Sequence, residues 1–228
     1  MSFSDWLTFA NGFVGYFGEP AIGTTTSWFP TRALVMASIS GSYDAGGSIA
    51  SANAVPNTLP KGFTSGKLRT LINPVISGPS NHGLICMQSA DNMQGGLNSK
   101  GYAVMLDSIL FSNRLVLVRM NDGISASLGG ALGSSYSALG YSANGVWVQN
   151  TIYALEIEWH VNTLIPGTHV IGRFGTMTDF SDLTVFAEVF DNTSHAVLTS
   201  VGEGPYAMVA SNPVLVTFDN TQLFSMTP

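Results

Sequence analysis

The segment at residues 153–161 constrains the fold more than any other part of the chain. Its odd positions are apolar (Tyr153, Leu155, Ile157, Trp159 and Val161), and three of its even positions are polar (Glu156, Glu158 and His160). Alternation with a period of two is typical of a β-strand that has one face in a core and the other in water. On a helix the same large side chains would be scattered around the circumference. The segment therefore predicts a long strand in the middle of a curved antiparallel sheet.

Other strand candidates follow one another along the chain, separated by turns rich in Gly, Pro and Asn. They lie at residues 33–39, 67–76, 83–89, 101–106, 114–120, 124–128, 169–174, 183–190, 195–201, 205–210 and 214–218, and the strand at 153–161 is expected to begin at Trp147. Asp122-Gly123 supplies the positive φ angles of a tight turn and predicts a hairpin between 114–120 and 124–128. No segment has a convincing helical pattern. This succession predicts an all-β sandwich or barrel.

Residues 1–32 differ from the rest because aromatic side chains alternate there with Gly and small polar residues. We interpret them as an aromatic N-terminal arm or a first strand, followed by a single domain at residues 33–228. The aromatics dock either onto the chain's own sandwich or onto another subunit. The candidates for such an assembly interface are Phe3, Trp6, Phe9, Phe13, Tyr16 and Phe17.

The composition narrows the range of partners. Only 10% of the 228 residues are charged, against about 25% in typical proteins. We therefore expect neighbouring subunits to cover part of the surface, as in a homo-oligomer. The net charge is −6 and the sequence has no run of Lys or Arg, which argues against nucleic-acid binding.

The sequence also bears on cysteine chemistry and location. Cys86 is the only cysteine, which excludes an intramolecular disulfide and a cysteine-based zinc site. We expect it to be a buried strand thiol. The sequence has no 18-residue apolar run that would predict a membrane span and no leader pattern that would predict secretion. We therefore expect the protein to fold in a cytoplasm.

Four motifs in a fixed order suggest a family. They are Gly101-Tyr102, the run from Arg119 to Gly123, Tyr153-Ala-Leu-Glu-Ile157, and the closing run from Val214 to Asn220. In this order the chain resembles the laminin-G-like, concanavalin A-like jelly-roll superfamily over about residues 67–226. The resemblance implies a two-sheet antiparallel jelly-roll sandwich with one convex and one concave sheet. Many members bind glycans on the concave face or the rim, some of them with calcium, others pack only against proteins, and such domains recur in bacteriophage virion proteins.

Some relatives with this fold hydrolyse β-glucans through a strand of the type Glu-x-Asp-x-x-Glu. Glu156-Ile-Glu158 matches the first half of that pattern, but Val161 stands in the place of the last acid. A retaining mechanism needs two carboxyl groups about 5–5.5 Å apart on one face. We therefore interpret Glu156 and Glu158 as residues of a solvated strand face and expect no enzymatic activity, with a glycoside hydrolase as the remote alternative.

No metal or cofactor is expected. The four histidines, His82, His160, His169 and His195, lack the spacing of metal ligands in the sequence, although they could still cluster in space. Three Asp-Asn pairs could ligate calcium or form turns at strand ends, and the turns are favoured. The pairs are Asp91-Asn92, Asp191-Asn192 and Asp219-Asn220, of which the last is expected to end or bulge the closing strand.

Residues 129–146 are rich in Gly and Ser and are expected to form a loop. Aromatic rings stack on sugars, and amides bond their hydroxyl groups. The loop therefore provides the glycan-binding candidates, although the same aromatics could instead pack on the sandwich or a neighbour. These candidates are Tyr136, Tyr141, Asn144 and Trp147.

Together these observations favour a non-enzymatic structural protein of a virus particle, such as a phage capsid decoration, knob or tail-associated component. It would act by assembly with other virion proteins. The alternative is a lectin-like module that binds a cell-surface glycan, for example as the receptor-binding part of such a particle.

Overall fold

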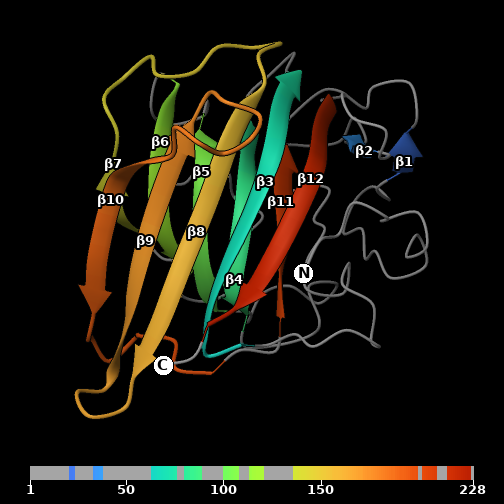
Figure 1. Cartoon of the computed structure of the whole chain (residues 1–228). Coiled ribbons are helices and arrows are strands. Elements are labelled where there is room, and N and C mark those ends of the chain that lie inside the picture. Colours follow the sequence, from blue (N-terminus) through green and yellow to red (C-terminus); the bar gives the residue numbers. More distant parts are fainter. Residues whose placement is uncertain are drawn as a thin grey trace.

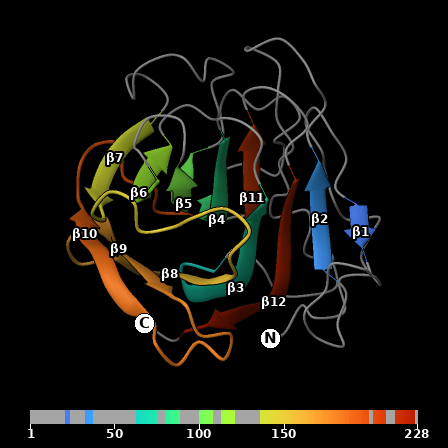
Figure 2. The same cartoon turned by 90° about the horizontal axis from the view of Figure 1, so that it is seen from above.

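The computed structural model describes residues 21–23, 33–37, 63–75, 80–88, 100–107, 113–120, 136–199, 202–209 and 215–226. Within these ranges the chain forms two antiparallel sheets and no helix (Figure 1). Seen from above, the two sheets form two facing layers (Figure 2). The prediction of an all-β, two-sheet jelly-roll sandwich is confirmed. No helix in the described part is long and apolar enough to cross a membrane.

Counting only the described residues, one sheet has seven strands and the other has five. The seven-stranded sheet runs in the order β1 (Ala21–Gly23), β2 (Ala33–Ala37), β12 (Leu215–Ser225), β3 (Ser65–Val75), β8 (Tyr153–Asn162), β9 (Gly167–Gly175) and β10 (Thr184–Asp191). The five-stranded sheet runs in the order β11 (Gly202–Val209), β4 (Ser80–Gln88), β5 (Gly101–Asp107), β6 (Arg114–Met120) and β7 (Tyr136–Tyr141). Because β1 lies within residues 1–32, part of that segment is a strand, while the domain boundary after residue 32 stays a prediction.

Strand β8 lies in the interior of the seven-stranded sheet, as its sequence pattern predicts. It pairs with β3 on one side and with β9 on the other. Its first four odd positions, from Tyr153 to Trp159, point into the core between the sheets, and Val161 packs at the margin of that core. The even positions face away from the core, on the outer face of the seven-stranded sheet. This strand begins at Tyr153 and not at Trp147.

The five-stranded sheet supplies much of the core. Tyr102, Val104 and Leu106 of β5 face the other sheet, and Ala103 and Met105 on its opposite face are also buried. A short, nearly continuous apolar run is what a strand buried on both faces requires. Cys86 is a buried thiol on the neighbouring strand β4, as expected.

Two loop expectations were wrong. The predicted hairpin between 114–120 and 124–128 does not form with β6, because β6 pairs with β5 along one edge and with β7 along the other. Residues 124–128 themselves lie outside the described ranges. Residues 136–141, expected to be loop, form β7. The turn residues Asp122-Gly123 suggested that the next segment in sequence would pair with β6. Tertiary packing instead places β7 on that edge of β6.

The structure also differs at residues 195–199, which were expected to be strand and are not. The main chain of Val197 bonds side chains instead of a neighbouring strand: its N–H donates to the Tyr102 hydroxyl at 3.1 Å, and its carbonyl accepts from Thr168 Oγ1 at 2.5 Å. The closing strand β12 continues past Asp219 with a shift in register, which confirms the predicted bulge.

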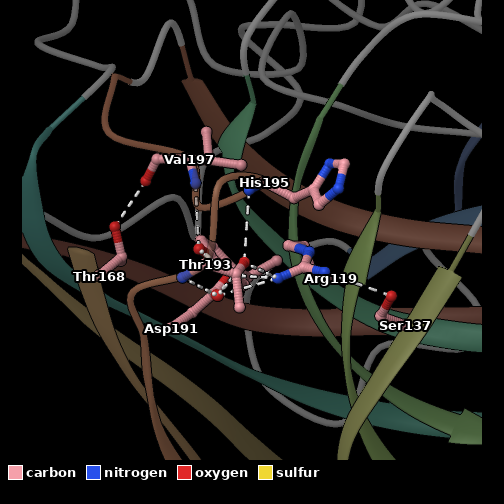
Figure 3. A network of polar contacts seen from close by, with 8 residues as sticks. Arg119, Ser137, Thr168, Asp191, Thr193, His195 and Val197 are labelled. Atoms are coloured by element: carbon pink, nitrogen blue, oxygen red, sulfur yellow. Dashed lines mark hydrogen bonds and ion pairs between the residues drawn. The ribbon is translucent and has the colours of Figure 1, made fainter. Parts of the chain in front are cut away.

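A buried polar network joins the two sheets at this point (Figure 3). Arg119 of β6 donates through Nη1 to both carboxylate oxygens of Asp191 at the end of β10, at 2.9 and 2.8 Å, and to Thr193 Oγ1 at 2.7 Å. The Tyr102 hydroxyl donates to Asp191 Oδ2 at 2.8 Å. The network links β6 to the end of β10 and holds the segment that follows β10.

Candidate functional site

The outer face of the seven-stranded sheet carries a row of ion pairs. Arg173 Nη1 on β9 lies 2.7 Å from Glu156 Oε1 and 2.7 Å from Glu158 Oε2 on β8. Lys67 Nζ on β3 lies 3.9 Å from Glu156 Oε2. Glu156 is only 4% exposed, so the expectation of a solvated strand face is wrong for this residue. A single guanidinium nitrogen therefore holds both glutamates in an ion-pair network.

The environment of Glu158 keeps its carboxyl group ionised. Burial alone would raise its pKa, but hydrogen bonds from His160 and Arg173 outweigh burial and lower the pKa below its usual value. A general acid needs the opposite change, a raised pKa. The arrangement therefore favours an electrostatic role for this carboxylate over proton donation.

Two histidines lie next to each other at the end of this row. His160 and His169 are direct partners in the pairing of β8 with β9, and their ring centroids are 6.5 Å apart. His160 Nε2 lies 2.9 Å from Glu158 Oε1, and His169 Nε2 lies 2.8 Å from Glu188 Oε1 on β10. Each imidazole is therefore oriented by a carboxylate. Among the described residues, no group of three or more His, Cys, Asp or Glu is arranged to hold a metal ion.

An open hollow of about 630 Å³ lies beside this histidine pair. The turn between β8 and β9 forms part of its wall, and Asn162 Oδ1 fixes the shape of that turn by accepting from the N–H groups of Leu164 and Ile165 at 2.9 and 3.0 Å. Leu164 is 93% exposed and Phe190, on β10, is 39% exposed. The hollow is lined by Ser65, His160, Val161, Asn162, Thr163, Leu164, Ile165, His169 and Phe190.

Ser65 contributes an unusual polar group to this wall. It is the register partner of His160 on the neighbouring strand β3. The residue is 3% exposed, and its hydroxyl oxygen has no hydrogen-bond partner among the described residues. Leaving a buried polar group unpaired costs about 1–3 kcal/mol. Rotation of this hydroxyl toward the hollow would let a hydroxyl-bearing ligand relieve that cost.

The glycan-binding candidates from the sequence do not form one surface. Trp147 is 1% exposed and belongs to the core, where its indole N–H donates to the carbonyl of Arg114 at 3.0 Å. Its ring is not available for stacking, so the expectation for Trp147 was wrong. Tyr136 begins β7, and its side chain lies outside the described part.

Tyr141 and Asn144 do come together, around Arg114. The Arg114 guanidinium lies 5.7 Å from the centre of the Tyr141 ring, and its Nε donates to Asn144 Oδ1. Tyr141 is 41% exposed. Sequence reasoning missed Arg114, which lies on β6 and was interpreted only as a strand residue. A glycan contact at Tyr141 and Asn144 stays a prediction.

The remaining candidates divide between turns and undescribed segments. Asp191 bonds Arg119, Tyr102 and Thr193, so its carboxylate serves the inter-sheet network and a turn. The pair at Asp91 and Asn92 lies outside the described residues, as do the six proposed interface aromatics Phe3, Trp6, Phe9, Phe13, Tyr16 and Phe17. The assembly interface therefore stays a prediction.

Comparison with known proteins adds evidence on the fold. No family model matches the chain, and no curated protein matches its sequence. The structure is similar to the endo-β-1,4-glucuronan lyase of the fungus Trichoderma reesei, with a TM-score of 0.57, 10% identity, and coverage of 92% of this chain and 87% of the lyase. It is also similar to a Bacillus subtilis protein of unknown function with a galectin-like fold, with a TM-score of 0.53, 10% identity, and coverage of 90% and 88%.

A third similar structure is an engineered GH43 glycoside hydrolase, with a TM-score of 0.51 and 7% identity. The match covers 86% of this chain and 35% of that enzyme. At such low identity these likenesses concern the fold and not the activity. The chain is a jelly-roll sandwich with galectin-like structural neighbours.

Proposed function

We propose that this chain is a non-enzymatic carbohydrate-binding protein that holds a sugar in the hollow beside the β8–β9 turn. The observation that carries the proposal is the combination of groups in that hollow. Phe190 offers an aromatic ring, His160 and His169 are oriented by carboxylates, and the buried Ser65 hydroxyl has no hydrogen-bond partner within the described ranges. Small-molecule sites typically measure about 300–1,000 Å³ and place a few polar groups in a mainly apolar wall.

The absence of catalysis in this proposal rests on the two carboxylates of β8. A double-displacement mechanism requires one protonated acid and one free nucleophile. Here Arg173 binds both Glu156 and Glu158, and the pKa of Glu158 is lowered. The groups that remain in the hollow are suited to hydrogen bonding and stacking.

A glycan array followed by titration of the full chain tests the proposal. Phe190→Ala removes the aromatic ring, and we expect it to weaken binding at least tenfold, because stacking and apolar contact are lost. Val185→Ala is the matched control, since Val185 is also an exposed apolar residue of β10 but does not line the hollow. Failure to bind any glycan, or equal binding by both variants, would contradict the proposal.

Assembly in a phage virion is the second candidate function, as a capsid decoration or tail-associated component that presents the glycan site. Its support is the low charge content of 10%, together with exposed apolar side chains on the described surface. They include Val148, Leu164, Ile165, Met177, Val185 and Leu198. Binding to other virion proteins and a location in the virion are part of this second proposal and not of the first.

The solution mass of the chain with and without residues 1–20 tests this second function. The deletion removes all six aromatic candidates and leaves the residues of β1 in place. A defined oligomer that dissociates on deletion supports assembly through the arm. A monomer in both forms would rule out self-assembly.

A further inference from the structure

The charges around the hollow limit which sugars it accepts, provided that the proposed carbohydrate function holds. In the described part of the chain, no Lys or Arg lines it. Glu158 and Glu188 lie directly behind the two imidazoles, and the nearby guanidinium of Arg173 is already bound to Glu156 and Glu158. Among the described residues, the carboxylate of an acidic sugar would meet two like charges and no unbound cation, which is unfavourable.

The polar groups of the hollow complement uncharged hydroxyl groups. A carboxylate can only accept, so in each neutral imidazole the nitrogen that faces the glutamate carries the proton. The other ring nitrogen of His160 and of His169 is then an acceptor, and it has no partner among the described residues. The Ser65 hydroxyl can both donate and accept. These three groups can bond a neutral polyol without any charge on the ligand.

The rest of the wall is apolar, and a ligand that carries hydroxyl groups alone would leave much of this apolar surface without an apolar contact. Val161, Leu164, Ile165 and Phe190 all line the hollow. Leu164 is almost fully exposed at the tip of the turn, where it contributes little to the core. A methyl group on the ligand would bury against these side chains and remove apolar surface from water.

We infer that the hollow is specific for an uncharged sugar that carries a methyl-bearing substituent, either an N-acetyl group or the methyl group of a deoxy sugar. The hydroxyl groups of the sugar bond Ser65 and the free imidazole nitrogens, and the methyl group contacts Leu164 and Ile165. Acidic sugars are excluded by the glutamates behind the histidines.

The test compares matched sugars on the full-length chain by NMR titration of the lining residues. One set contains N-acetylglucosamine, glucose and glucuronic acid as free reducing sugars, a second contains the galacto equivalents, and a third pairs L-fucose with L-galactose. We expect the methyl-bearing member to bind at least about tenfold more tightly than its hydroxyl counterpart, since one methyl group in an apolar pocket discriminates by that factor or more. The uronic acid should bind most weakly.

Variants connect this preference to the residues. Leu164→Ser should reduce the preference for the methyl-bearing sugar and leave binding of the hydroxyl sugar almost unchanged. Met177→Ser is the control, because Met177 is an exposed apolar residue beyond the opposite end of β9 and does not line the hollow. A preference that survives Leu164→Ser would overturn the assignment of the methyl contact.

The possible outcomes separate the two proposals. If sugars bind in the hollow but uronic acids bind as tightly as neutral ones, or the methyl group gives no advantage, the inferred specificity is wrong and the carbohydrate function stands. If no sugar of any set shifts the resonances of the lining residues, the proposed function itself is wrong, and the inference falls with it.

Discussion

Arg119 and Asp191 form a buried ion pair that links the two sheets, with Arg119 Nη1 at 2.9 Å from Asp191 Oδ1 and 2.8 Å from Oδ2. Asp191 accepts further hydrogen bonds from the Tyr102 hydroxyl and from Thr193. Both charged residues are almost completely excluded from solvent. Their charges are therefore stable in the core only as a pair, and the pair determines where the segment after β10 lies.

Asp191→Asn removes one charge and leaves the Arg119 guanidinium buried without its partner. We expect a loss of about 3–5 kcal/mol in the free energy of unfolding, the usual effect of breaking a buried pair. Urea unfolding monitored by tryptophan fluorescence measures it. Glu188→Gln on the same strand is the control, because its pair with His169 is largely exposed and should contribute less than about 1 kcal/mol. Equal effects of the two substitutions would contradict this account.

The same pair predicts acid sensitivity. Burial would raise the pKa of Asp191, but the hydrogen bonds from Arg119, Thr193 and Tyr102 outweigh burial and lower it. A lowered native pKa means that the unfolded chain binds the proton first as the pH falls. The contribution of Asp191 is therefore complete above its unfolded pKa of about 3.9 and is lost as the pH falls through its native pKa.

Urea midpoints between pH 5 and pH 2 check this prediction. The unmodified chain should lose stability progressively below about pH 4, and Asp191→Asn should show a shallower decline over the same range. NMR titration of the Asp191 carboxyl in the folded chain is a second measurement that does not depend on the variant. A native pKa at or above the unfolded value would contradict the prediction.

The strand pattern of the sequence was informative where burial differs between the two faces of a strand. Residues 153–161 predicted β8 because large apolar groups alternate with glutamates and a histidine. The pattern was silent at β7, where Tyr136-Ser-Ala-Leu-Gly-Tyr141 has neither strong alternation nor charge. That strand exists because the free edge of β6 accepts it, which is a property of tertiary structure. The strand prediction for residues 195–199 was wrong for a related reason. The side chains of Tyr102 and Thr168 bond the main-chain N–H and carbonyl of Val197, which a neighbouring strand would otherwise do.

The candidate site was only partly accessible from the sequence. His160 and His169 lie symmetrically about Leu164 and Ile165, so a tight turn there would have predicted that they pair across a hairpin. Ser65 comes from β3, however, and its position opposite His160 depends on the register between two strands distant in the chain. The sequence also did not reveal that Trp147 is buried. An indole N–H can bond a backbone carbonyl in the core as readily as it can bond a ligand, so the residue type alone does not distinguish the two.

Gly83 and Gly145 should resist substitution by alanine for different reasons, a steric clash at Gly83 and a positive φ angle at Gly145. A Cβ on Gly83 of β4 would lie 1.8 Å from the carbonyl oxygen of Val104 on β5. Gly83→Ala must therefore separate two central strands, and we expect it to destabilise the fold by about 3 kcal/mol. Gly145→Ala has no neighbouring atom to meet but a φ of +68°, so about 1 kcal/mol of backbone strain is expected. Thermal unfolding of both variants should rank them in this order, and the reverse order would contradict the contact at Val104.

Removing the Arg173 guanidinium should affect the stability of the fold without affecting sugar binding. Arg173→Gln leaves the buried Glu156 with Lys67, at 3.9 Å, as its remaining ion-pair partner among the described residues, and it removes one of the two partners of Glu158. We expect a loss of about 2 kcal/mol in unfolding free energy, less than for a fully buried pair because the guanidinium is partly exposed. Sugar affinity should change little, since Arg173 does not line the hollow. A large loss of affinity in a variant that remains folded would mean that the glutamates, and not the hollow alone, contact the ligand.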